Sequence, residues 1–304
     1  MKIFYLFVMK KILKYITLII GFAPMMVSAQ ENPNIFSYKV GAAEVCLLSE
    51  GQSMGNADIF IGATPEMIQK AVPNGTYPRS CNAFLVRILG KNILIDTGYG
   101  RNLFDNLKSF GVTPEQIDAV LITHVHGDHL GGMLKDDKAA FPNAELYLSK
   151  AEHDYCMNGE ARNANAQKVI ETYRSKLRLF EPKEIDNPLP LLFHFIQDKD
   201  VAGIQAVAAY GHTPGHTLFM VVSGDEKLLV WGDLTHAMAI QMPHPQVAMT
   251  YDTNTGMAVA ARQKALEYVA KNNIPVAGMH TAFPGMGKIT KASDGGYSHT
   301  PLAK

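Results

Sequence analysis

Thr-His-Val-His-Gly-Asp-His-Leu-Gly-Gly, at residues 123–132, is the most informative stretch of this 304-residue chain. It places four side chains that commonly bind metal ions within six positions: His124, His126, Asp128 and His129. The apolar residues 119–122 before it have the pattern of a short buried strand. Imidazole and carboxylate groups crowded this closely repel or desolvate one another unless a cation organises them, so the stretch predicts a metal site.

The spacing within this motif predicts two metal ions. Residues two apart at the end of a strand point the same way, so His124 and His126 can bind one ion together. Gly127 permits a turn, after which Asp128 and His129 can face a second ion. No cysteine takes part, which argues against a closed structural zinc site.

The motif His-x-His-x-Asp-His after a strand is similar to the signature of the metallo-β-lactamase superfamily. Three later segments resemble the remaining motifs of that family: Gly-His-Thr-Pro-Gly-His-Thr at 211–217, Trp-Gly-Asp-Leu at 231–234, and an apolar strand at 274–279 that leads into a histidine. The resemblance covers roughly residues 35–304. It implies an α/β fold, the αβ/βα sandwich, in which two central mixed sheets are flanked by helices.

The resemblance also implies the ligand set. His216 is expected as the third ligand of the first metal, Asp233 as the carboxylate that bridges both ions, and His280 as the last ligand of the second. His212 lies four residues before His216, and the match selects the histidine after Pro-Gly instead. The complete implied set is His124, His126, Asp128, His129, His216, Asp233 and His280.

The remaining acidic and histidine residues are weighed separately. Asp96, in Asp-Thr-Gly after a strand pattern, is expected to orient a ligand imidazole through the nitrogen that does not bind metal. The alternative is an aspartate that caps its own turn. Histidines outside the motifs are expected to be solvated or core residues: His153, His194, His236, His244 and His299.

Local patterns predict several elements of this fold. Residues 83–89 and 92–95 have the pattern of a hairpin. Thr113-Pro114-Glu115-Gln116 has the pattern of a helix start with a capping box. The helix expected after Asn254 has one apolar face, formed by Ala261, Ala265, Tyr268 and Val269. No repeat or linker divides residues 30–304, which we expect to form one domain.

The ligand set implies hydrolysis at two divalent ions, with zinc expected first and manganese, cobalt or iron as alternatives. Two cations make a shared water a hydroxide near neutral pH, so no side-chain nucleophile is needed. Asp128, close to that hydroxide, is the catalytic candidate that accepts or relays a proton to the leaving group.

Departures from subfamily patterns narrow the substrate. Zinc β-lactamases generally lack a bridging aspartate, and a β-lactam needs carboxylate-binding groups that the sequence does not reveal. The segments 230–243, 251–252, 284–287 and 295–297 resemble methyl parathion hydrolase and its lactonase relatives. The resemblance implies a lactone or ester substrate, with phosphotriester (organophosphate) hydrolysis as a side activity. The alternatives are a β-lactam hydrolase, a mononuclear iron oxidative enzyme, or a catalytically silent metal-binding protein of the same fold.

Residues 1–29 have the pattern of a signal peptide, whether the chain starts at Met1 or Met9. Lysines precede an apolar stretch, 15–26, which is shorter than the ~20 residues of a spanning helix. We therefore expect cleavage after Ala29, no stable membrane anchor, and a periplasmic or secreted protein.

The charge and the cysteine content of the chain limit the kinds of partner and the disulfides that we expect. The 28 basic and 28 acidic residues balance, so a small-molecule substrate is expected and nucleic acid is not. A homodimer is left open. Cys46, Cys81 and Cys156 could form one disulfide and a free thiol, or stay as buried thiols.

Overall fold

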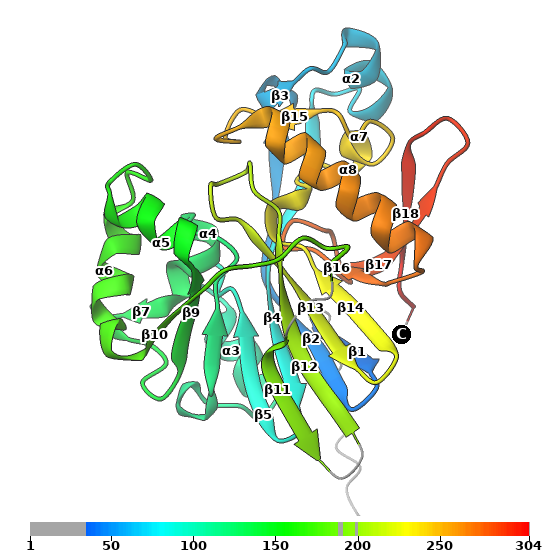
Figure 1. The fold of residues 1–304 in the computed structure, drawn as a ribbon. Coiled ribbons are helices and arrows are strands. Elements are labelled where there is room, and N and C mark those ends of the chain that lie inside the picture. The colour runs from blue at the N-terminus through cyan, green and yellow to red at the C-terminus, as the bar shows by residue number, and fades with distance from the viewer. Residues whose placement is uncertain (1–34, 188–190, 198–199, 304) are drawn as a thin grey trace, which may run out of the picture. The chain divides into compact units, whose positions relative to one another are not determined.

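The computed structural model describes residues 35–187, 191–197 and 200–303, so the expected signal peptide lies outside the described part. Two sheets of seven strands each form the centre of the fold (Figure 1). The first has the order β1 (Ile35–Val40), β2 (Ala43–Asn56), β4 (Thr76–Ile88), β5 (Lys91–Ile95), β6 (Ala119–Leu121), β9 (Glu145–Ser149) and β10 (Leu177–Phe180). The second has the order β11 (Leu191–Gln197), β12 (Asp200–Ala208), β13 (Thr217–Ser223), β14 (Glu226–Val230), β16 (Val276–Ala277), β17 (Met286–Lys291) and β18 (Tyr297–Pro301).

Both sheets are mixed, as expected. In the first sheet the pairs from β1 to β5 are antiparallel and those from β5 to β10 are parallel. In the second sheet only β14 and β16 pair in parallel. Parallel pairing requires a crossover between strands, and the crossovers carry the helices and the motif loops.

The helices lie outside the two sheets. They are α2 (Pro65–Ala71), α3 (Leu103–Ser109), α4 (Gly127–Leu130), α5 (Lys150–Met157), α6 (Ala164–Thr172), α7 (Met238–Gln241) and α8 (Thr255–Lys271). Short pieces complete the described chain: β3 (Phe60–Ile61) with β15 (Ala248–Met249), β7 (Leu134–Lys135) with β8 (Lys138–Ala139), and 3₁₀ turns at Ala57–Ile59, Pro114–Gln116, Gly131–Met133, Arg174–Lys176 and Gly232–Leu234.

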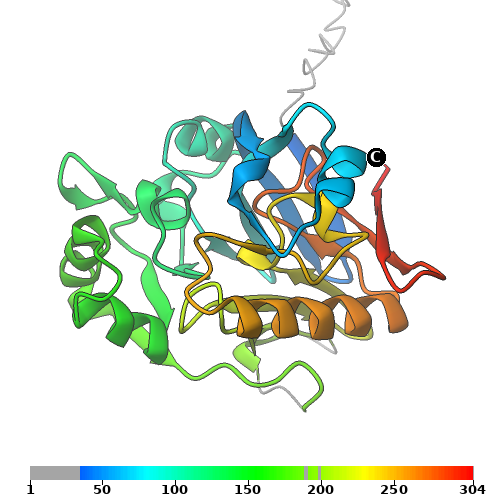
Figure 2. The same cartoon turned by 90° about the horizontal axis from the view of Figure 1, so that it is seen from above.

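Three apolar clusters hold these layers together. The central cluster joins the inner faces of the two sheets, with Phe84 from the first and Phe219 from the second fully buried. A second cluster packs α3 and α6 on the outer face of the first sheet. A third packs Leu266 and Val269 of α8 on the outer face of the second sheet (Figure 2). The layer order of helix, sheet, sheet and helix is the αβ/βα sandwich that the motifs imply.

The local patterns are confirmed, and at one of the three places the predicted element is shorter than an α-helix. The predicted hairpin is β4 and β5, and the predicted helix is α8, whose N-cap Asn254 accepts a hydrogen bond from Met257 N. The capping box at Thr113 forms, but the helix stops after one 3₁₀ turn at Gln116. The chain is extended from Ile117 because β6 begins at Ala119, two residues later.

The thiols and the helices of the described chain have two further features. Cys46, Cys81 and Cys156 are free thiols, so no disulfide links them. None of the helices in the described ranges is both long and apolar enough to cross a membrane.

Candidate metal centre

Loops at the ends of strands bring the motif residues together. The first motif follows β6, the histidines of the second lie between β12 and β13, Asp233 follows β14, and His280 follows β16. His124, His129 and Asp233 are buried, although each is polar. Buried polar side chains are costly unless they are paired or bind an ion, so this cluster needs an explanation in terms of its partners.

The first donor group consists of His124, His126, His212 and Asp233, whose ligand atoms lie within 4.8 Å of one another. His126 Nδ1 is 2.9 Å from His124 Nε2 and 3.1 Å from His212 Nε2. Oδ2 of Asp233 is 3.2 Å from His212 Nε2. Three imidazole nitrogens and a carboxylate oxygen facing one point form a donor set that suits a divalent transition metal.

The second donor group consists of Asp128, His129 and His280, which also fit within 4.8 Å. Both histidines of this group face the second carboxylate oxygen of Asp233. Asp233 Oδ1 is 2.9 Å from His129 Nε2 and 3.1 Å from His280 Nε2. Among the described residues, neither His129 Nε2 nor Asp233 Oδ1 has a hydrogen-bond partner, although both are buried. Two buried ligand atoms that face each other at 2.9 Å without forming a hydrogen bond, at the junction of the groups, fit bound metal.

The two oxygens of Asp233 therefore face different donor groups, as a carboxylate that bridges two cations must. The loop that carries it depends on Gly232, which has a φ of +55°. A Cβ at Gly232 would lie 2.5 Å from His216 Nε2, so the motif has no room for a larger residue there.

The structure corrects the expectation for His216. This ring is buried outside both donor groups, where Nδ1 donates to the carbonyl of Ala209 at 3.0 Å and Nε2 accepts from the backbone N–H of Asp233 at 3.0 Å. Both nitrogens are thus used by the backbone, and His212 occupies the position expected of His216. The cause is the turn at Gly215, which packs so tightly on α5 that a Cβ there would lie 2.2 Å from Glu152 N.

Two carboxylates hold the far sides of the ligand rings. Asp96 Oδ2 is 2.6 Å from His129 Nδ1, and this carboxylate also accepts hydrogen bonds from Thr123 N and Oγ1, so Asp96 lies where the sequence predicts. Asp252 Oδ1 is 2.8 Å from His212 Nδ1. Such partners fix the tautomer and orientation of a ligand imidazole. Asp252 lies in the segment 251–252 that resembles the lactonase relatives, but its role was not predicted.

A third carboxylate, Glu152 of α5, connects the two loops that carry the first donor group. Its Oε1 accepts from Val125 N at 2.9 Å, between His124 and His126. Its Oε2 accepts from Thr213 Oγ1 at 2.7 Å and from Gly215 N at 2.9 Å. The side chain is fully buried, and no sequence pattern indicates this contact because α5 is distant in the chain from both loops.

His236 was expected to be a solvated or core residue, and it lies instead beside the bridging candidate. Its Nε2 is 2.9 Å from Asp233 Oδ2, and together with His280 these residues form a third potential donor group. Its buried Nδ1 has no hydrogen-bond partner among the described residues. In the sequence, only its position three residues after Asp233 indicates that His236 could lie near the metal centre.

The charges of the centre are coupled. Burial opposes ionisation of Asp233, yet His129 and His280 hold its pKa well below the usual value. Burial likewise opposes protonation of His129 and His212, but Asp233 and neighbouring carboxylates raise the pKa of His129 well above normal and that of His212 to about 9. Asp128 also has a lowered pKa, because His129 outweighs its burial. Protons on these histidines therefore balance the carboxylates, and bound cations would replace them.

The centre opens into a cavity of about 330 Å³. Its lining consists of Arg79, Tyr99, His126, Gly127, Asp128, Asp233, His236, Tyr251 and His280. The side chain of Asp128 remains 22% exposed, so it can reach both the second donor group and a molecule in the cavity. A small substrate can therefore approach the donor groups directly.

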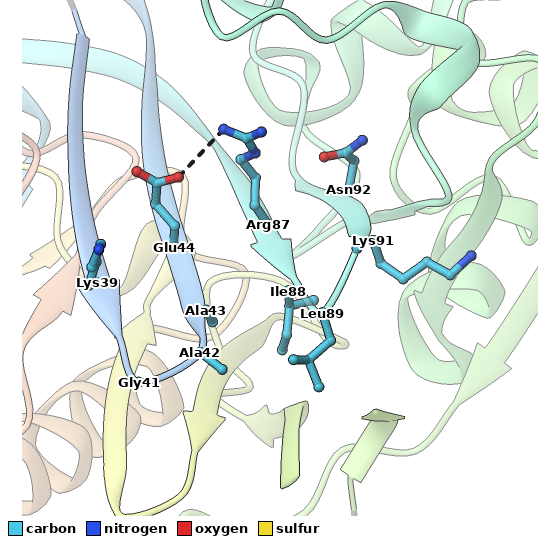
Figure 3. Close-up of a pocket in the computed structure, with 11 residues that line it drawn as sticks. Lys39, Gly41, Ala42, Ala43, Glu44, Arg87, Ile88, Leu89, Lys91 and Asn92 are labelled. Atoms are coloured by element: carbon cyan, nitrogen blue, oxygen red, sulfur yellow. Dashed lines mark ion pairs between the residues drawn. The ribbon is translucent and has the colours of Figure 1, made fainter. Parts of the chain in front are cut away.

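A larger cavity of about 450 Å³ lies elsewhere on the first sheet, next to the β4–β5 turn (Figure 3). Arg87 lines it and pairs with Glu44 at 3.6 Å, while Lys39 and Lys91 complete its charged lining. It contains no histidine or cysteine, and no cluster of reactive groups lies in it. The 330 Å³ cavity is thus the candidate active site.

Comparisons with known proteins agree with this geometry. The family model of the metallo-beta-lactamase superfamily matches residues 76–276. The structure is similar to the hydrolase AbOPH of the beta lactamase superfamily, with a TM-score of 0.76, 26% identity, and coverage of 89% of this chain and 98% of that one. It is also similar to AidC, a dizinc quorum-quenching lactonase, with a TM-score of 0.75, 26% identity and the same coverage.

Curated relatives match over shorter spans. A ribonuclease of Thermus thermophilus is 28% identical over 173 residues, which cover 55% of this chain and 38% of the ribonuclease. Ribonuclease Z of Thermococcus gammatolerans is 25% identical over 159 residues, 47% of this chain and 50% of that protein. The chain thus spans half or less of these relatives. Since the family model covers more than half of this chain, and the donor groups are those of the matching motifs, the chain belongs to the metallo-beta-lactamase superfamily.

Proposed function

We propose that this superfamily hydrolase binds two divalent metal ions, zinc first, and uses them to open lactones or to cleave aryl esters. The observation that carries the proposal is the position of Asp233, whose two carboxylate oxygens face separate donor groups. A bridging carboxylate is the feature that sets this chain apart from the zinc β-lactamase pattern. Similarity to a dizinc lactonase over most of both chains supports the same substrate class.

When bound, two divalent ions activate water and polarise the bond under attack. The residues of the chain do the remaining work. Asp96 and Asp252 hold the rings of His129 and His212 in place, so that the Nε2 atom of each ring faces Asp233. Asp128 borders the cavity and keeps its carboxylate partly exposed, so it is the group positioned to accept a proton and pass it to the leaving oxygen.

The test is a comparison of kcat/KM for four substrates, with the zinc-loaded protein: an acyl-homoserine lactone, an aryl ester, a methyl phosphotriester and a chromogenic cephalosporin. We expect the lactone or the aryl ester to be preferred, and the phosphotriester to be a slower side reaction. A preference for the cephalosporin of about tenfold or more, roughly 1.4 kcal/mol in transition-state binding, would contradict the proposal.

The ribonuclease relatives supply a further comparison, because they share the family but match over shorter spans. A labelled RNA belongs in the same assay as a fifth substrate. We expect no cleavage, since the balanced charge of the chain offers no excess of cations for a phosphate backbone. RNA cleavage at rates above those for the lactone and ester would assign the chain to the ribonuclease group instead.

A further inference from the structure

Arg79 of β4 lies beside the metal centre, in the wall of its cavity. Alternate side chains of a strand share one face, so Arg79 and Cys81 point the same way. The Cys81 thiol donates to the carbonyl oxygen of Asp128 at 3.5 Å, which places this face of β4 against the first motif. Burial raises the pKa of Tyr99 and of Tyr251, and the charge of Arg79 opposes part of each rise. This effect is expected if the guanidinium lies near both tyrosine rings, which line the cavity.

The guanidinium of Arg79 is anchored at one nitrogen only. Its Nε donates to Ser53 Oγ at 3.0 Å, across the β2–β4 pair in which these two residues are directly opposite. Within the described ranges, Nη1 and Nη2 form no hydrogen bond or ion pair. An arginine held at Nε keeps its outer edge of two nitrogens in a fixed orientation, and that edge matches the two oxygens of a carboxylate.

The charge of Arg79 is also isolated. It is the only lysine or arginine among the described residues that line this cavity. The carboxylates of the cavity, Asp128 and Asp233, belong to the donor groups, so neither is available to neutralise it. A surface arginine with a structural role would be expected to pair with an acidic neighbour, as Arg87 on the same strand pairs with Glu44.

We propose that Arg79 is a specificity-determining residue that binds a carboxylate of the substrate, so that the preferred esters or lactones carry an anionic group remote from the bond that is cleaved. This inference rests on the proposed hydrolase function and adds the class of acyl group to it. A cavity of about 330 Å³ limits that group to a small acid.

Two esters with acyl groups of equal length distinguish an effect of the acyl charge from an effect of its size. They are 4-nitrophenyl hydrogen glutarate, which has a free carboxylate, and 4-nitrophenyl pentanoate, which has none. Hydrolysis of either adds water to the acyl carbon and releases 4-nitrophenol, so one absorbance assay serves both after the uncatalysed rate is subtracted. We expect the zinc-loaded protein to prefer the glutarate ester, chiefly through a lower KM.

Arg79→Met keeps the length of the side chain and removes its charge. We expect it to reduce the preference for the glutarate ester about tenfold, equivalent to roughly 1.4 kcal/mol, while kcat/KM for the pentanoate ester changes little. Arg79→Lys should recover only part of the preference, because an ammonium lacks the two-nitrogen edge. Arg87→Met, at the other end of β4 in the cavity of Figure 3, is the matched control and should leave the preference unchanged. Equal losses for both esters in Arg79→Met would overturn the proposal.

A binding measurement separates this inference from the proposed function. Calorimetry with the zinc-loaded protein compares glutarate with butyrate, which has one carboxylate instead of two. We expect tighter binding of glutarate, and we expect Arg79→Met to abolish the difference. If the protein hydrolyses neither ester but shows this dependence, the substrate class is wrong and the role of Arg79 stands. If the wild-type protein binds both acids equally, the role of Arg79 is wrong whatever the protein hydrolyses.

Discussion

Replacing Glu152 by alanine should weaken the first donor group and the fold together. The carboxylate accepts three hydrogen bonds, from Val125 N, Thr213 Oγ1 and Gly215 N, and it is fully buried. Burial raises its pKa, and the three donors oppose that rise. The residue thus connects the His124–His126 segment to the loop of His212 without touching a metal-binding atom itself.

The magnitude follows from the groups left behind. The Thr213 hydroxyl can rotate to another acceptor, but the two backbone N–H groups cannot. Each buried donor without a partner costs about 1–3 kcal/mol of stability. Part of this loss is offset, because the variant no longer has to remove a carboxylate from water when it folds. We therefore expect Glu152→Ala to lose roughly 2–5 kcal/mol of unfolding free energy, a large share of the ~5–15 kcal/mol of a typical domain. Glu152→Gln keeps one acceptor oxygen for Val125 and should lose about 1–2 kcal/mol.

The assay is urea unfolding of the metal-free protein, together with zinc affinity from competition with a chromogenic chelator. Asp154→Ala is the matched control, because this residue lies on the same helix and forms an exposed ion pair with Lys150. The control should lose less than about 1 kcal/mol and keep its zinc affinity. If Glu152→Ala is as stable as the control and binds zinc equally well, Glu152 does not hold the two loops together.

Three other outcomes test the centre itself. His212→Ala should retain about half of the bound zinc, whereas His216→Ala should keep the full amount and lose stability; metal analysis after dialysis would show the reverse if His216 were the ligand. Asp233→Ala should lose zinc and hydrolysis together, so turnover with two ions still bound would disprove the bridge. Burial opposes protonation of His212, but Asp233 and Asp252 raise its pKa to about 9 in the metal-free protein. Zinc must displace that proton, so zinc affinity should rise with pH up to about 9, and equal affinity at pH 7 and pH 9 would contradict this.

Much of the fold was predictable because its signals are local. The first motif follows a short buried strand, and the hairpin and α8 carry their own turn and capping residues. The helix start at Thr113 forms, but the helix stays at one 3₁₀ turn for a non-local reason. A capping box favours a first turn, but the nearby start of β6 leaves no length for a second.

The ligand set was predictable only in part. His212 and His216 have nearly identical sequence surroundings, since each follows glycine and precedes threonine. Which ring enters the centre depends on the close packing of Gly215 on α5 and of Gly232 under the His216 ring. Both contacts join segments far apart in the chain, so no spacing within the motif could reveal them.

The cavity wall was likewise beyond the sequence. Arg79 belongs to no motif, and its role depends on which face of β4 meets the loop of Asp128. His236 and Asp252 were part of segments that resemble lactonases, yet only the folded chain shows that they contact Asp233 and His212.

We infer that Asp233 joins two metal sites in one active centre. Zinc titration of the metal-free protein, with bound metal counted after equilibrium dialysis and lactone turnover measured on the same samples, tests it most directly. We predict two zinc ions per chain, turnover that appears as the second ion binds, and loss of both in Asp233→Ala. Binding of a single ion, or full turnover at one ion per chain, would show that Asp233 does not join two sites.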